Sequence, residues 1–154
     1  MMLTRGLVLA ALVIAVPGEA SAQLIVTGIR NLDFGVVLQG VASVVPPTDP
    51  VKSGQFYFRT PGLGTRVRIR FTLPTQLNGP GGASMPISFA NNDARAQGTA
   101  PASLPILFNP NGAAVFTMTT SPDANVWLGG RVAPAAAQAV GTYSNTVIMT
   151  VTMF

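Results

Sequence analysis

The chain has 154 residues, of which 48% are hydrophobic and only 9% are charged, and its formal net charge is +4. It contains no cysteine and no histidine, which excludes disulfides, thiolate nucleophiles, histidine metal sites and Ser-His-Asp catalysis. A chain with so little charge and no disulfide must be stabilised by core packing or by strands of a partner.

The first 22 residues have the three parts of a secretory signal. Arg5 lies near the start, an apolar run covers Leu7–Val16, and Ala20-Ser21-Ala22 places small residues before the cleavage point. The apolar run is shorter than the roughly 20 residues needed to cross a bilayer, which disfavours a membrane anchor. We therefore expect cleavage after Ala22 and export of residues 23–154 as one domain.

Residues 23–154 are predicted to be all-β. The 16 glycines and 13 prolines of the chain separate short segments rich in Val, Ile, Thr and Phe, and no segment has the period of an amphipathic helix. Seven or eight short strands of this kind fit an immunoglobulin-like β-sandwich. We expect strands near Leu24–Ile29, Gly35–Val45, Gly54–Thr60, Thr65–Leu73, Met85–Ala90, Ala113–Thr119, Val126–Val132 and Tyr143–Phe154, and loops at Thr75–Gly82 and Asn91–Pro105.

Apolar and arginine side chains alternate along Thr65–Leu73. In a strand they point to opposite faces, so three guanidinium groups would stand in a row about 7 Å apart. Such a row could bind an anionic polysaccharide, a lipopolysaccharide phosphate or nucleic acid, or it could simply solvate an outer sheet face. No aromatic residues alternate with the arginines, which disfavours nucleic acid. The apolar face comprises Val67, Ile69, Phe71 and Leu73, and the arginine face comprises Arg66, Arg68 and Arg70.

The few acidic residues do not indicate catalysis or metal binding. Asp33 is predicted to be a turn residue before Gly35, with Leu32 and Phe34 in or near the core. The other aspartates of residues 23–154 fall in segments rich in Pro, Asn or Ser, where turns are the expected explanation. We therefore expect no enzyme, no cofactor and no metal site. These other aspartates are Asp49, Asp93 and Asp123.

Two aromatic residues late in the chain are predicted to support the fold. We expect Trp127 and Tyr143 to pack near the core of the sandwich. The Tyr143 hydroxyl is a candidate for the corner-type hydrogen bond known from other sandwiches.

The two ends of the exported domain resemble a known family. Leu32-Asp33-Phe34-Gly35, the run Trp127–Val132, and Gly141-Thr142-Tyr143-Ser144-Asn145-Thr146 before a last strand that ends on Phe154 are similar to the spore coat protein U / archaic chaperone–usher pilin superfamily. They are also similar to the bacterial domain of unknown function numbered 4402. The resemblance covers most of the chain from Leu32 onward, but its specific motifs lie at the two ends.

This resemblance implies that residues 32–154 form an incomplete immunoglobulin-like sandwich, exported to the periplasm and displayed on the cell surface. The implied partners are a periplasmic chaperone, an outer-membrane usher and copies of the same or related subunits, whose N-terminal segments would fill a groove by β-augmentation. Members of this group often carry a cysteine pair, which this chain lacks. The candidate donor residues are Leu24, Val26 and Gly28 in one alternating set, and Ile25, Thr27 and Ile29 in the other.

Two alternatives stay open at the level of sequence. Residues 23–31 are short, so they can form either a donor segment or the first strand of their own domain. The expected function is a structural subunit of a secreted bacterial surface fibre that assembles by donor-strand exchange. The alternative function is a monomeric secreted β-sandwich that binds an anionic surface glycan through Arg66, Arg68 and Arg70.

Overall fold

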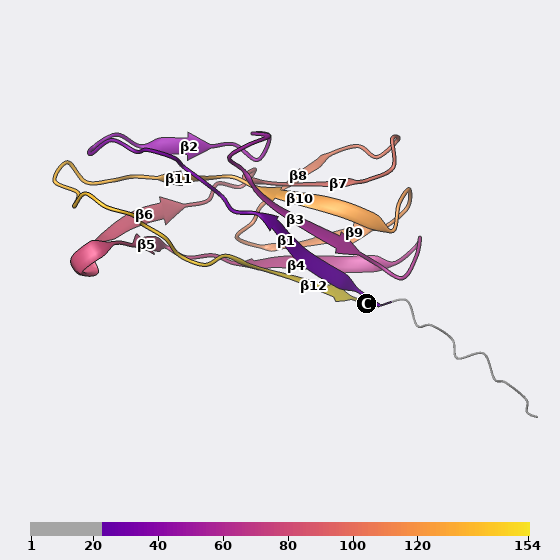
Figure 1. The fold of residues 1–154 in the computed structure, drawn as a ribbon. Coiled ribbons are helices and arrows are strands. Elements are labelled where there is room, and N and C mark those ends of the chain that lie inside the picture. The colour runs from indigo at the N-terminus through magenta and orange to yellow at the C-terminus, as the bar shows by residue number, and fades with distance from the viewer. Residues whose placement is uncertain (1–22) are drawn as a thin grey trace, which may run out of the picture.

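The structure, a computed structural model, describes residues 23–154, and the predicted signal segment 1–22 lies outside the described residues. The described chain is an all-β sandwich of antiparallel strands, as the sequence predicts (Figure 1). It has twelve strands, more than the seven or eight expected, and one 3₁₀ turn at Pro80–Gly82. The strands are β1 (Ile25–Arg30), β2 (Ser43–Val45), β3 (Gly54–Arg59), β4 (Arg66–Thr72), β5 (Gln76–Asn78), β6 (Ser84–Ser88), β7 (Ala94–Gly98), β8 (Ile106–Phe108), β9 (Ala113–Thr117), β10 (Asp123–Leu128), β11 (Gly130–Val132) and β12 (Ile148–Met153).

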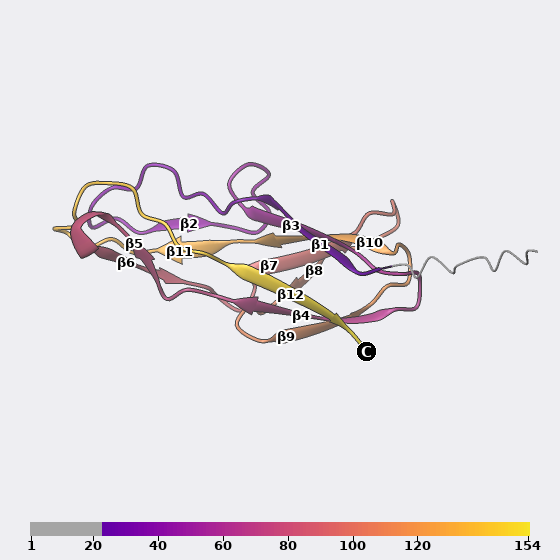
Figure 2. The ribbon, with the colours of Figure 1, turned by 60° about the horizontal axis from the view of Figure 1, so that its bottom comes forward.

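The strands form three sheets. A five-stranded sheet has the order β1-β3-β10-β7-β8, a three-stranded sheet has the order β12-β4-β9, and a four-stranded sheet has the order β2-β11-β6-β5. Figure 2 shows the three-stranded sheet below the strands β1, β3 and β10. The β5–β6 hairpin lies at the left end of the molecule in this view. In an immunoglobulin sandwich one sheet has the order A-B-E-D and the other C-F-G. If β1, β3, β4, β7, β10 and β12 are strands A to F, the five-stranded sheet contains the order A-B-E-D and the three-stranded sheet contains the neighbours C and F.

The core lies between the five-stranded and the three-stranded sheets. Phe58 of β3, Val67 and Ile69 of β4 and Val126 of β10 are almost fully buried there. A row of aromatic rings crosses the core, with centroid distances of 5.7 Å, 6.3 Å and 5.4 Å between successive members. The row comprises Phe56, Phe71, Phe108 and Phe116.

A second, smaller apolar cluster lies at the end that carries β5, β6 and β11. Its buried residues are Met85, Ile87 and Val132. Phe34 and Tyr143, from opposite ends of the chain, pack against these residues. This cluster forms the base of the site described below.

Two predicted strands are shorter in the structure than expected. Of Gly35–Val45 only β2 is a strand, because Gly35 and Gly40 have φ angles of +66° and +70°, which an extended strand does not allow. Of Tyr143–Phe154 only β12 is a strand, and before it Ser144 forms an isolated antiparallel bridge with Asn78.

Both predicted loops contain strands. The segment Thr75–Gly82 contains β5, and Asn91–Pro105 contains β7, whereas β8 was not expected at all. In β7 the buried inward residues are Ala94 and Ala96, which carry almost no hydrophobic signal. The alternation in β7 is therefore real but hard to recognise in the sequence.

Two side-chain predictions for β10 are wrong. Ala124, Val126 and Leu128 are buried, so Trp127 points to the outer face of the five-stranded sheet and not to the core. There the Arg95 guanidinium carbon lies 4.8 Å from the centre of the Trp127 ring.

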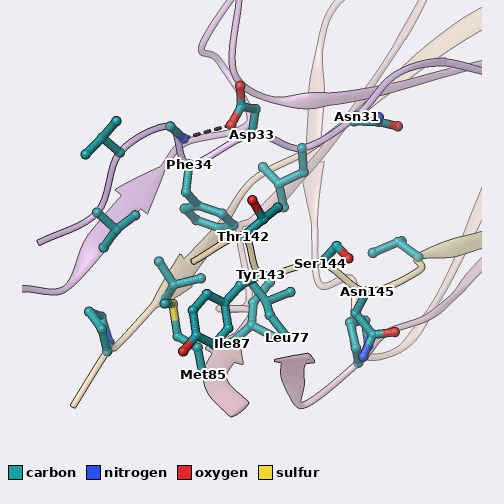
Figure 3. A pocket seen from close by; sticks show the side chains of 18 of the residues that line it. Asn31, Asp33, Phe34, Leu77, Met85, Ile87, Thr142, Tyr143, Ser144 and Asn145 are labelled. Atoms are coloured by element: carbon teal, nitrogen blue, oxygen red, sulfur yellow. Dashed lines mark hydrogen bonds between the residues drawn. The ribbon is translucent and has the colours of Figure 1, made fainter. Parts of the chain in front are cut away.

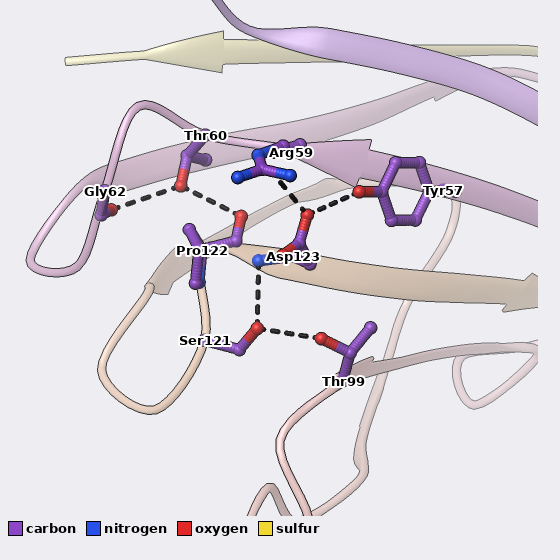
Figure 4. Close-up of polar contacts among 8 residues, drawn as sticks. All are labelled: Tyr57, Arg59, Thr60, Gly62, Thr99, Ser121, Pro122 and Asp123. Carbon is purple, nitrogen blue, oxygen red and sulfur yellow. Dashed lines mark hydrogen bonds and ion pairs between the residues drawn. The ribbon is translucent and has the colours of Figure 1, made fainter. Parts of the chain in front are cut away.

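Asp123 is the first residue of β10 rather than a loop residue (Figure 4). Its carboxylate accepts a hydrogen bond from the Tyr57 hydroxyl and lies 3.8 Å from Arg59 Nε. The hydrogen bond to Asp123 raises the pKa of Tyr57 above its usual value of 10.0. The Asp123 side chain thus connects β10 to β3.

The other aspartates act in turns, as predicted. Gly35 N–H donates to Asp33 Oδ1 at 2.7 Å, and Ala90 N–H donates to Asp93 Oδ2 at 2.7 Å. Asp49 Oδ1 accepts from the N–H groups of Val51 and Lys52, both at 2.8 Å, and these bonds lower the pKa of Asp49 below 3.8.

Candidate functional site: an apolar groove beside strand β12

Strand β12 has a partner on only one side. It pairs with β4 along its whole length, from Ile148 opposite Thr72 to Met153 opposite Val67. Within residues 23–154 no strand pairs with its other edge. In a complete immunoglobulin sandwich this edge of strand F is occupied by strand G.

The register shows which backbone groups lie on the unpaired edge. Phe154 N–H donates to the Arg66 carbonyl at 3.2 Å, so these two residues form a hydrogen-bonded pair. Because such pairs alternate along an antiparallel ladder, the backbone groups of Ile148, Thr150 and Thr152 also point toward β4. The N–H and C=O groups of the residues between them therefore point to the unpaired edge. These residues are Met149, Val151 and Met153.

A groove of about 930 Å³ lies along the segment that leads into β12, and its lining ends at Val147, the residue before the strand. One wall is the chain that follows β1, and the other is the segment that leads into β12 (Figure 3). We call it the β12 groove. The first wall is residues 28–37, the second wall is residues 139–147, and the floor includes Leu77, Met85, Ile87 and Val132.

The second wall is held in place by Tyr143. Its hydroxyl donates to the Ala139 carbonyl at 2.7 Å and accepts from Gln138 Nε2 at 2.7 Å. The bond to a carbonyl four residues upstream is the corner-type bond that the sequence suggested, and the ring packs on the buried cluster, so the prediction for Tyr143 is confirmed. This wall requires glycine at position 141, because its φ is +153° and an added Cβ would lie 2.6 Å from Pro80 Cγ.

The first wall is shaped by Leu32-Asp33-Phe34-Gly35. The Asp33 carboxylate caps the turn at Gly35, and the Phe34 ring packs on the same buried cluster as Tyr143 (Figure 3). Leu32 is half-buried, and its side chain lies against Gly54 and Gly130. Both sequence motifs therefore meet at the β12 groove, although more than 100 residues separate them. Phe154, the remaining motif residue, is not part of the groove and packs against the arginine face.

The donor candidates lie in strand β1, which pairs with β3 of the same chain. This is the placement expected of a first strand. The strand is at the edge of its sheet, and its register shifts between Gly28 and Arg30. Val26 and Gly28 lie opposite Phe58 and Phe56, so the set that includes Leu24 faces the core, while Ile25 and Thr27 face outward.

Strand β1 is held loosely. Five of its six residues are exposed, and the exposed fractions of Ile25, Val26 and Ile29 are 48%, 40% and 55%. Only its last residue is fixed by side-chain bonds, because Arg30 donates to the carbonyls of Ser53 and Pro50 at 2.8 Å and 2.6 Å.

The three arginines stand together on the outer face of β4, as predicted. Val67 and Ile69 are buried on the inner face, and Phe71 is half-buried, which confirms the alternation. The arginine face lies on the three-stranded sheet, away from the floor of the β12 groove. The outer residues are Arg66, Arg68 and Arg70.

Sequence reasoning missed the floor residues of β5 and β6. The signal was present, because Gln76-Leu77-Asn78 alternates in polarity and a Gly-Pro-Gly-Gly turn separates it from Met85 and Ile87. These two short segments pair as a hairpin, with Leu77 opposite Met85.

Comparisons with protein-family models, with curated proteins and with solved structures return no match. The resemblance to the chaperone–usher pilins therefore stays a prediction. Residues 23–154 contain no cluster of three or more acidic side chains that could hold a metal ion. In the same part of the chain no helix has the length and hydropathy needed to cross a membrane.

Proposed function

We propose that this protein is a structural subunit of a secreted bacterial surface fibre that assembles by exchange of β-strands. The observation that carries the proposal is the unpaired edge of β12, which continues from one wall of a groove with an apolar floor. An edge strand with unpaired N–H and C=O groups is a template for another strand, and natural proteins usually cover or block it. An added strand would gain backbone hydrogen bonds from β12 and pockets for alternate side chains from the groove.

The proposed occupant is the segment Gln23–Ile29 of a second copy. Its alternating apolar residues suit insertion between two sheets, and β1 and β12 are both six residues long. In its own chain the segment buries only one face against the core, so Ile25 and Ile29 remain exposed. Moving into the β12 groove of a neighbour would open the β3 edge but would bury more apolar surface of the segment.

Assembly through this groove explains why export factors are expected. Before a neighbouring copy arrives, the β12 edge and the groove floor would be open to aggregation. A periplasmic chaperone that covers the groove and an outer-membrane usher that admits the next copy would prevent this. The expected route is through the inner membrane to the periplasm and then to the cell surface.

Removal of the segment tests the proposal. Deleting Gln23–Gly28 from the mature protein should abolish polymers seen by electron microscopy and size-exclusion chromatography, while the domain stays folded in the presence of its chaperone. If the deletion unfolds the domain even with the chaperone, the segment belongs to its own sheet and the exchange proposal is contradicted.

Point variants test the same segment without removing its backbone. Val26→Asp and Thr27→Asp carry the same charge at adjacent positions, and in β1 they face the core side and the outer side, respectively. One of them should abolish polymers, because a charge inserted into the apolar groove lacks a partner, and the other should retain them. Polymers formed equally well by both variants would contradict the proposal.

A further inference from the structure

Strand β4 presents an uninterrupted row of cations on the outer face of the three-stranded sheet. Its register with β12 places Arg68 beside Thr152 and Arg70 beside Thr150, and β9 places Val115 beside Arg68 on the other side. The side chains of these neighbours are uncharged. Along one strand, alternate residues stand about 7 Å apart, so the three guanidinium groups repel one another.

These arginines have no acidic partner within residues 23–154. The one ion pair in this part of the chain joins Arg59 and Asp123, on the five-stranded sheet. Arg30 and Arg95 are also occupied, because they donate to Ser53 and Gln97. The cations that remain for an external anion are the three of β4, which stand in one row, and Lys52 and Arg131, which lie outside that strand. The other three aspartates of the described chain, Asp33, Asp49 and Asp93, bond to backbone N–H groups in turns.

Phe154 organises two of the three side chains. The guanidinium carbons of Arg66 and Arg68 lie 4.7 Å and 4.8 Å from the centre of its ring. Cation–π contacts restrict the rotamers of both arginines without neutralising their charge. The entropy lost when the two side chains bind an anion is therefore smaller than for free arginines.

We propose that Arg66, Arg68 and Arg70, with Phe154 as their support, form a binding face for an anionic polysaccharide. Planar guanidinium groups bind sulfate and carboxylate oxygens in a bidentate manner, and a row of them matches a polymer with repeated anionic groups. Nucleic acid fits less well, because single strands require several rings for base stacking and Phe154 is the one aromatic residue among the outward-facing residues of β4 and its neighbours. The face does not depend on strand exchange, since it lies outside the β12 groove.

The test measures binding of a fluorescent, size-defined heparin oligosaccharide to the mature full-length protein by anisotropy. Arg66→Gln with Arg68→Gln should weaken binding about tenfold at moderate salt, because two bidentate contacts are lost. The matched control is Lys52→Gln with Arg131→Gln. It removes the same charge from two exposed side chains that lie outside β4. This control should weaken binding about threefold or less, through net charge alone.

Two further variants keep the test decisive. Arg66→Lys with Arg68→Lys retains the charge but loses the planar groups, so it should weaken binding about threefold. Phe154→Leu retains an apolar side chain but loses the ring, and it should also weaken binding about threefold.

Equal losses in the β4 variant and in the Lys52/Arg131 control would overturn the assignment of the site. Binding of a single-stranded DNA of equal charge as tightly as heparin, with the same loss in the β4 variant, would overturn the assignment of the ligand.

Discussion

Strands β1 and β12 lie at the edges of opposite sheets, and the segments that adjoin them form the two walls of the β12 groove, but the strands are attached very differently. In β12, Met149 and Val151 are buried in the main core, with exposed fractions of 8% and 7%. In β1 no residue is buried, and only Arg30 is held by side-chain bonds.

This difference suggests a division of roles between the two strands. Strand β12 completes the core and supplies a fixed edge, whereas β1 covers part of the sandwich without being essential to its packing. Elements with few buried contacts open locally at low free-energy cost, which is what an exchangeable strand requires.

The largest effect should come from truncating matched valines in the two strands. Val151→Ala removes buried methyl groups from the core and should lower the free energy of unfolding by about 2 to 3 kcal/mol. Val26→Ala, at a position that is 40% exposed, should lower it by less than about 1 kcal/mol. Urea denaturation of the monomer measures both, and equal losses would show that β1 is as well anchored as β12.

A smaller effect is expected from the hydroxyl that positions the approach to β12. Tyr143→Phe leaves the Ala139 carbonyl and Gln138 Nε2 each without one hydrogen-bond partner and should cost about 1 to 2 kcal/mol. Tyr57→Phe is the matched control on the outer face of β3, where the Asp123 carboxylate keeps its contact with Arg59, and it should cost less. Urea denaturation would contradict this ranking if the Tyr57 variant were the less stable one.

The smallest effect should appear at acidic pH, at the end of β1. The Asp49 carboxylate orders the turn whose Pro50 carbonyl accepts from Arg30, and backbone hydrogen bonds lower its pKa. This stabilisation is therefore complete above the ordinary pKa of 3.8 and is lost as the pH falls through the lower value of the folded protein.

Amide exchange of Arg30 should accordingly accelerate in acid, relative to the intrinsic rate, more than that of Met149. Asp49→Asn, which keeps an oxygen acceptor but does not titrate, should remove this pH dependence. An unchanged acid response in this variant would show that Asp49 does not control the end of β1.

The sequence predicted the parts of the fold that follow from strong alternation or from special backbone positions. The strand predicted at Thr65–Leu73 is found as β4, because valine, isoleucine and arginine alternate there without interruption. The turn predicted at Asp33 is also found, because a carboxylate before a glycine favours a turn. Strand β7 was missed because buried alanines give little contrast with their neighbours. Trp127 was misplaced because a large aromatic residue suggests a core position, although the parity of β10 directs it outward.

The candidate site was only partly predictable. The motifs around Phe34 and Tyr143 were recognised, but nothing in their spacing showed that both side chains pack on one cluster. The floor comes mainly from the β5–β6 hairpin, whose turn signal was present in the sequence but whose strands have only three and five residues. Pairing between distant segments depends on the whole fold, and a local pattern does not encode it.

Hydrogen exchange resolved by residue in β12 tests the central claim most directly. In the monomer, the amides of Ile148, Thr150 and Thr152, which point to β4, should be protected, and those of Met149, Val151 and Met153 should exchange faster. In assembled fibres the second set should become protected by about 100-fold or more, because an added strand bonds to them. Equal protection of the second set in monomer and fibre would contradict strand exchange at this edge.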